Sequence, residues 1–159
     1  MATNVRGLSG LRWFLILIVI VGLLIDAYVH FHLASAYSGV KSSVVSQGDL
    51  FRVEATAALI AAAALLFRPR TYTAALAFLV AAGGTAAVVV YTYVNLGSFG
   101  PLPNMYDPSW YTEKTLSAVA EGIAAVAALI LLVLMRAETR QTTHATASSS
   151  GRPAMRARG

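Results

Sequence analysis

Four stretches of almost uninterrupted apolar residues dominate the chain, over residues 11–34, 50–67, 72–96 and 113–135. Each stretch reaches or approaches the roughly 20 residues that an α-helix needs to cross about 30 Å of hydrocarbon. None shows the alternation of apolar and polar positions that a barrel strand requires, and backbone groups in lipid must find their hydrogen bonds internally. The pattern therefore predicts an all-α polytopic membrane protein, built as an antiparallel bundle of four transmembrane helices.

The positions of the 12 Lys and Arg residues predict the orientation of this bundle. Lys41, Arg52 and Lys114 fall at one end of the apolar segments, and the other basic residues fall at the opposite end or in the C-terminal tail. Because cytoplasmic flanks carry the excess of basic residues, we expect both termini in the cytoplasm and the protein in the plasma membrane. The same distribution accounts for the net charge of +5, so no nucleic-acid partner is expected.

The chain divides into three parts. Residues 1–10 form a short cytoplasmic N-terminus, residues 11–136 the four-helix domain, and residues 137–159 a basic tail. The tail has no apolar periodicity, so we expect it to be disordered. The basic start and the first apolar run also resemble a cleavable signal peptide, but residues 26–32 are long and bulky for the segment before a cleavage site. We therefore expect the first span to be retained.

The two outer loops carry signals for helix starts. Asp49 closes a loop rich in Ser and Gly, and we expect it to be the N-cap of the second helix. Asp107 is followed by Pro108, which fits an N-cap with proline at the first helical position, so the fourth helix is expected to begin there. Residues 100–106 are expected either to lie across the outer mouth of the bundle as a partly apolar lid or to form an interfacial loop.

Five polar side chains lie inside the apolar segments near their outer ends: Asp26, His30, Glu54, Tyr91 and Glu121. At 1.5 Å per residue they lie about 7–15 Å below the outer helix ends, in one slab roughly two turns thick. An ionised group in hydrocarbon costs from about 3 to more than 10 kcal/mol, so such groups normally face a protein interior or a water-filled cavity. We therefore expect these residues to form a polar pocket that opens outward.

The helical spacing gives the same result independently of depth. Each polar residue continues a stripe of small residues, which mark the faces where membrane helices approach one another. These stripes are Gly22, Asp26 and His30; Glu54, Ala57, Ala58, Ala61 and Ala62; Gly83, Ala87 and Tyr91; and Ser117, Glu121, Ala125 and Ala128. His32 does not share the helix face of Asp26 and His30 and lies near Tyr28, so we expect it at the membrane–water interface. The inner halves of the spans carry no ionisable side chain, which argues against a monomeric channel or proton-coupled carrier.

Three interpretations of the polar layer stay open. The first is a non-enzymatic protein, or an accessory subunit, that binds a small polar ligand, a cation or protons from the outer side. The second is a structural partner in which buried polar groups fix the helix packing. The third is a metal- or quinone-dependent membrane oxidoreductase.

If a metal binds, the expected ligands are Asp26, His30 and Glu121, a mixed N/O set that suits zinc, iron or manganese. The chain has no cysteine, which excludes thiol chemistry. We assign no catalytic residue, and the sequence names no cofactor. The expected partners are the lipid bilayer and a membrane protein or a second copy of the chain.

Three segments carry a resemblance to known sequences: residues 29–34 (VHFHLA), 46–55 (SQGDLFRVEA) and 100–106 (GPLPNMY), the last followed by Glu113-Lys114-Thr115. On these the chain resembles small four-helix integral membrane proteins of actinobacteria, over about residues 8 to 136. The resemblance implies a four-helix membrane fold and a source in that group. No activity is assigned to the group, so no mechanism follows from it.

Overall fold

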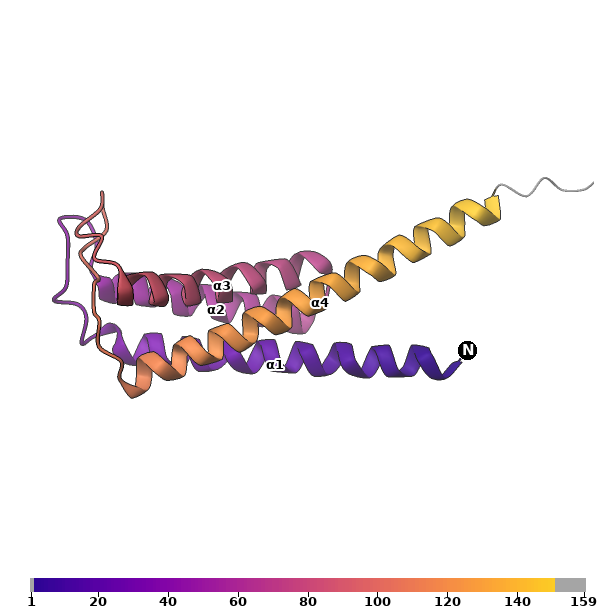
Figure 1. The fold of residues 1–159 in the computed structure, drawn as a ribbon, viewed down its shortest axis with the longest axis horizontal. Helices are drawn as coiled ribbons and strands as arrows, with labels where there is room; N and C mark the ends of the chain where they lie inside the picture. Colours follow the sequence, from indigo (N-terminus) through magenta and orange to yellow (C-terminus); the bar gives the residue numbers. More distant parts are fainter. Residues whose placement is uncertain (1, 151–159) are drawn as a thin grey trace, which may run out of the picture.

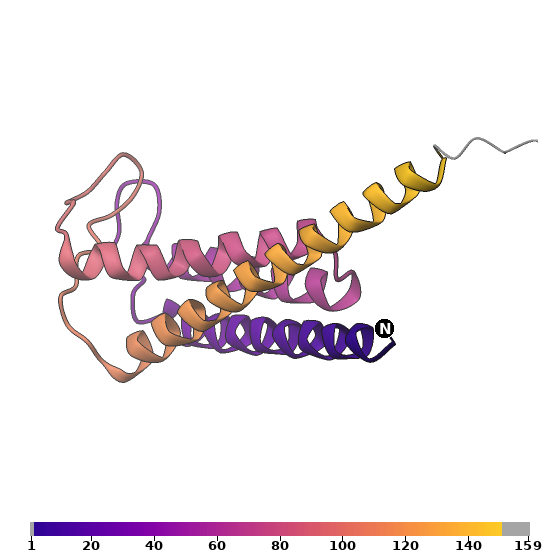
Figure 2. The same ribbon diagram turned by 45° about the vertical axis from the view of Figure 1, so that its right-hand side comes forward.

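The computed structural model describes the backbone of residues 2–150 and the side chains of residues 9–139. Four α-helices make up this part of the chain: α1 (Ala2–Ala34), α2 (Gln47–Phe67), α3 (Thr71–Tyr93) and α4 (Thr112–Ser150). Each helix contains a segment long and apolar enough to cross a membrane. The two long loops lie at one end of the bundle, and the N-terminus and the end of α4 lie toward the other (Figures 1 and 2). The predicted all-α bundle of four spanning helices is confirmed.

The helices form a closed ring in which α1 packs against α2 and α4, and α3 packs against α4 and α2, while α1 and α3 lie across the diagonal. Large side chains of α1 and α4 fill the core, and α2 and α3 contribute mainly alanines. At Gly22 an added Cβ would lie 2.8 Å from both the Ala120 carbonyl oxygen and the Ala124 Cβ. The small residues therefore let the helix backbones approach closely, as expected for helices that pack in lipid.

Large apolar side chains cover the outside of the bundle. Leu17 on α1, Ile60 on α2, Leu79 on α3 and Val126 on α4 are all exposed. A helix that is hydrophobic all round belongs in lipid or in the core of a large protein. The outer surface of this small bundle is thus suited to hydrocarbon.

The end of the bundle opposite the loops is held by Arg12. Its Nη2 donates a hydrogen bond to the Pro69 carbonyl oxygen at 2.7 Å, and its Nη1 lies 3.6 Å from Glu138 Oε2. One side chain of α1 thereby joins the turn between α2 and α3 to α4. This end is the one at which the sequence places the cytoplasm.

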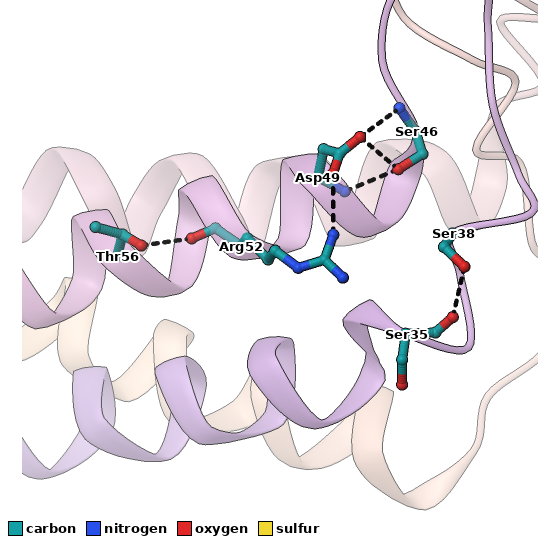
Figure 3. A network of polar contacts seen from close by, with 6 residues as sticks. All are labelled: Ser35, Ser38, Ser46, Asp49, Arg52 and Thr56. Carbon is teal, nitrogen blue, oxygen red and sulfur yellow. Dashed lines mark hydrogen bonds and ion pairs between the residues drawn. The ribbon is translucent and has the colours of Figure 1, made fainter.

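The start of α2 differs from the prediction, because Ser46 and not Asp49 is the N-cap (Figure 3). Ser46 Oγ accepts from the Asp49 backbone N–H at 3.1 Å, and Asp49 Oδ2 accepts from the Ser46 N–H at 3.1 Å. This reciprocal pair is a capping box, in which the acidic residue stands three positions inside the helix. Arg52 Nη1 also donates to Asp49 Oδ1 at 2.9 Å. The Asp49 carboxylate therefore stabilises the helix start from within its first turn.

The start of α4 also differs, since the helix begins at Thr112 and not near Pro108. Asp107 Oδ1 accepts from the Ser109 N–H at 3.0 Å, which forms a local turn. Such turns compete with helix formation in Ser, Thr, Asn and Asp residues. The loop therefore continues for one further turn before the helix starts.

The far end of α4 extends beyond the predicted span, through Ser150. The disorder predicted from Ala137 onward is not supported for residues 137–150, and residues 151–159 lie outside the described part of the chain. Ala, Glu, Arg and Gln, which are good helix formers, follow directly after the apolar segment and let the helix continue. The C-terminal ends of α1 and α3 lie closer to the predicted ends. Helix α1 ends at Ala34 as predicted, and α3 ends at Tyr93, three residues before the predicted end.

Candidate functional site

A buried polar cluster joins α1 and α4 in the half of the bundle nearest the two long loops. Asp26 and His30 come from successive turns of α1, and Ser117 and Glu121 come from successive turns of α4. The side chains of Asp26 and Glu121 are 0% exposed. His30 Nδ1 lies 2.6 Å from Asp26 Oδ1, and Ser117 Oγ lies 2.9 Å from the same oxygen and 3.1 Å from Glu121 Oε1. The structure thus brings together three of the five residues selected from the sequence.

Ser117 limits the protonation states that this cluster can adopt. A serine hydroxyl has one hydrogen to donate, and two carboxyl oxygens lie within hydrogen-bond distance of it. The hydroxyl can donate to one of them or share its hydrogen between both. A second full hydrogen bond requires that one carboxyl group carry a proton, so a proton shared by Asp26 and Glu121 would complete this arrangement.

Acceptors outnumber donors in the cluster and beside it. Asp26 Oδ2, Glu121 Oε2 and Glu54 Oε1 are buried without a hydrogen-bond partner among the described residues. A buried polar atom without a partner costs roughly 1–3 kcal/mol, and more when it is charged. Three such oxygens in one region mark a place where donors or a cation would be held.

Gly84 of α3 provides the space for the Glu121 carboxyl group. A Cβ added at Gly84 would lie 2.8 Å from Cδ, Oε1 and Oε2 of Glu121. The neighbouring Gly83, which the sequence placed on the helix contact, is exposed and has nothing within 4 Å of an added Cβ. Gly84 lies on the same buried helix face as Ala77 and Ala81. This helical spacing is the signal by which the sequence could have predicted that Gly84, and not Gly83, lies at the helix contact.

A cavity of about 340 Å³ lies beside the cluster, between the outer halves of the helices. Much of its wall is apolar and includes Leu33, Phe51 and Val88, and the loop before α4 adds Leu102 and Met105. His30, Ser117 and Gly84 belong to both the cavity wall and the cluster, whereas Asp26 and Glu121 lie behind that wall. The side chains of His30 and Ser117 therefore stand between the cavity and the buried carboxyl groups.

The remaining two predicted residues line this cavity and stay apart from the cluster. Glu54 of α2 and Tyr91 of α3 both lie in the wall, and neither is hydrogen-bonded through its side chain to Asp26, His30 or Glu121. His32 is exposed and stacks on Tyr28 with ring centroids 6.0 Å apart, and its place at the membrane interface stays a prediction. The five predicted residues thus separate into a buried triad and two positions on the cavity wall.

The rim of the cavity is built from the loop that precedes α4. Lys114 Nζ donates to the backbone oxygens of Asp107 at 2.5 Å and Ser109 at 3.1 Å, and it lies 5.4 Å from the centre of the Trp110 ring. These contacts fix the Lys114 charge at the rim, where it holds the loop against the helix.

A second rim contact joins the two outer loops, because the Tyr37 and Tyr111 hydroxyl oxygens lie 2.7 Å apart. Burial raises the pKa of the Tyr111 hydroxyl above its usual value, and the hydrogen bond to Tyr37 raises it further. The two loops are therefore joined by a hydrogen bond between two tyrosine hydroxyl groups.

The chain matches no protein-family model, no curated protein and no solved structure. The resemblance to actinobacterial membrane proteins accordingly stays a prediction.

Proposed function

We propose that this integral membrane protein binds a small amphiphilic amine, in its protonated form, from the outer side of the plasma membrane. The observation that carries the proposal is the Glu54 carboxyl group, whose Oε1 is buried without a partner among the described residues, in the wall of a largely apolar cavity. An ammonium group supplies both the hydrogen and the positive charge that such an oxygen needs.

The size and lining of the cavity support a ligand with an apolar body. A volume of about 340 Å³ lies at the small end of the range for ligand sites, which is roughly 300–1,000 Å³. The apolar side chains would bury the body of the ligand, and the few polar groups would fix its orientation. A short alkyl or aryl amine fits both requirements.

The charges around the cavity support a cation over an anion. Lys114 is the basic side chain at the rim, and its donors are directed to loop carbonyl oxygens and to Asp107. Glu54 makes no salt bridge among the described residues, and His30, which lines the same wall, is paired with Asp26. The unbalanced charge inside the cavity is therefore negative when Glu54 is ionised.

The expected orientation supports entry from outside. The cavity lies at the loop end of the bundle, and the excess of basic residues lies at the other end. Below the cluster the core consists of apolar residues such as Val19, Ala58 and Leu131, all 0% exposed. A pocket closed at its inner end fits a binding protein or accessory subunit better than a channel.

A structural role is the alternative, and the contacts between α1 and α4 favour it. Ser117 links Asp26 to Glu121, so the cluster could serve only to hold these two helices in register. In that case Glu54 would have no functional role, and the cavity would bind no specific ligand.

The test uses 2-phenylethylamine as the probe and the protein in lipid nanodiscs. We expect saturable binding to the wild type by calorimetry, and at least tenfold weaker binding to Glu54→Gln, because a hydrogen bond to a charged group contributes roughly 1.5–3 kcal/mol. The matched control is Glu113→Gln, which removes a carboxylate at the same end of the bundle but outside the cavity wall. 2-Phenylethanol, of similar shape without the charge, should bind weakly to every variant.

The outcomes separate the two interpretations. Equal binding by the wild type and Glu54→Gln, or no binding by a folded wild type, would refute the amine site and leave the structural role. Loss of binding in Glu113→Gln as well would show that the probe responds to surface charge and not to the cavity.

A further inference from the structure

The buried triad of Asp26, His30 and Glu121 has the composition and spacing of a metal site. Each residue offers one ligand atom, and these atoms lie within 4.8 Å of one another. Ligands of a tetrahedral zinc ion at about 2.0–2.1 Å from the metal are separated by roughly 3.4 Å. Side-chain rotations that bring the donor atoms to this spacing would therefore close the triad around an ion.

The unpartnered oxygens are an independent observation that points to the same ligand. With both carboxyl groups ionised, Asp26 Oδ2 and Glu121 Oε2 have no hydrogen-bond donor among the described residues, and both side chains are 0% exposed. In that charge state a cation between the carboxyl groups would satisfy these oxygens, and a proton shared by the two groups is the competing occupant.

The charge of the triad also matches a divalent ion. Two ionised carboxyl groups and a neutral imidazole carry two negative charges, which one dication neutralises. Arg12 is bonded to the turn at the opposite end of the bundle, Arg52 is paired with Asp49, and Lys114 is held at the rim. Because an uncompensated charge in a low-dielectric interior is very costly, either a dication or bound protons must balance the carboxylates.

The donor atoms select the class of metal. One imidazole nitrogen and two carboxylate oxygens suit Zn²⁺, Mn²⁺ or Fe²⁺, whereas Ca²⁺ requires six to eight oxygen ligands. The chain has no cysteine to attract soft ions. Three protein ligands leave one coordination position open, and His30 and Ser117 connect the triad to the cavity, which supplies a path of entry.

We propose that Asp26, His30 and Glu121 bind one divalent transition-metal ion, represented by Zn²⁺, directly behind the cavity wall that His30 and Ser117 form. Glu54 is not one of the ligands, so this site goes beyond the proposed amine binding and does not depend on it.

The experiment uses full-length protein in detergent, with any purification tag removed, first treated with a chelator and then dialysed against Zn²⁺ or Co²⁺. We expect about one Zn²⁺ per chain by elemental analysis after gel filtration. Co²⁺ at the same site should give the visible absorption bands of a four- or five-coordinate ion. Both signals should be lost in His30→Gln and in Glu121→Gln, with metal affinity reduced at least about 100-fold relative to the wild type.

Two controls are matched to these variants by residue type and helix. His32→Gln removes an exposed histidine of α1, and Glu113→Gln removes a carboxylate near the start of α4. Both should keep the full stoichiometry and the Co²⁺ spectrum. Glu54→Gln should also keep them, which makes failure of the metal site distinguishable from failure of the amine site.

Folding is checked by thermal unfolding and gel filtration of each variant. Should one ligand variant fail to fold, Asp26→Asn takes its place, because it preserves volume and removes only charge. A folded wild type without stoichiometric metal would overturn the proposal. So would a folded ligand variant that binds as the wild type does, or a His32→Gln variant that loses the metal equally.

Discussion

Adding a single methyl group at Gly84 should disturb the buried cluster, and adding one at the neighbouring Gly83 should not. In Gly84→Ala the new Cβ would lie 2.8 Å from three atoms of the Glu121 carboxyl group, closer than such atoms approach in folded proteins. In Gly83→Ala the Cβ would meet nothing within 4 Å. The two variants have the same composition and differ by one position on one helix.

The expected magnitude follows from two opposing effects. Replacing glycine by alanine inside a helix stabilises it by up to about 1 kcal/mol in both variants. Forcing a Cβ against the Glu121 carboxyl group, which Ser117 holds in place, costs roughly 1–3 kcal/mol, and only Gly84→Ala incurs this cost. Because the helix term cancels in the comparison, Gly84→Ala should be less stable than Gly83→Ala by about 1–3 kcal/mol.

The free energy of unfolding would be measured by titrating detergent-solubilised protein with a denaturing detergent and following helix content by circular dichroism. A double-mutant cycle then tests whether the cost arises at Glu121. In the Glu121→Ala background the carboxyl group is absent, so Gly84→Ala should cost no more than Gly83→Ala does.

Equal stability of Gly84→Ala and Gly83→Ala would refute this reasoning. It would mean that Glu121 can move away at no cost, and hence that the carboxyl group is not confined between α1, α3 and α4. A penalty that persists in the Glu121→Ala background would locate the overlap elsewhere.

Two further predictions concern the orientation and the rim. The orientation can be tested with single cysteines, since the chain has none of its own: Lys41→Cys, Met105→Cys and Arg70→Cys. In intact cells an impermeant thiol reagent should label the cysteines at positions 41 and 105 but not the one at position 70. Labelling at position 70 but not at position 41 would show the opposite orientation. The pKa of the Tyr111 hydroxyl is raised in the folded protein, whereas a tyrosine in the unfolded chain has a pKa near 10. Above about pH 10 the unfolded chain therefore loses a proton that the folded protein keeps, so the free energy of unfolding should fall as the pH rises further. Tyr111→Phe should lessen that fall, and an unchanged pH dependence would contradict the hydrogen-bonded, buried state of this hydroxyl.

The helices themselves follow from local sequence. Apolar segments of sufficient length determine four spans, because a backbone in hydrocarbon must form its hydrogen bonds within its own helix. The i, i+4 spacing likewise places Asp26 and His30 on one face, since four residues make slightly more than one turn. Their burial beside Glu121 agrees with the rule that ionisable groups within spans avoid lipid.

The helix ends were less predictable, because neighbouring signals compete. Ser46 and Asp49 can both cap a helix, and the reciprocal box formed by the pair places the start at Gln47. Asp107 bonds within its own turn and delays α4 to Thr112. Choosing between such alternatives depends on hydrogen bonds that a linear pattern does not specify.

The sequence by itself determined the four spans, the polar layer and the inward direction of its members. Only the tertiary structure decided which of those members meet: Asp26, His30 and Glu121 form one cluster through Ser117, while Glu54 remains on the cavity wall. It also decided that Gly84, and not Gly83, faces the Glu121 carboxyl group. Adjacent residues on a helix differ by about 100° in direction, and the rotation and crossing of four helices are set by packing between them, which no single segment encodes.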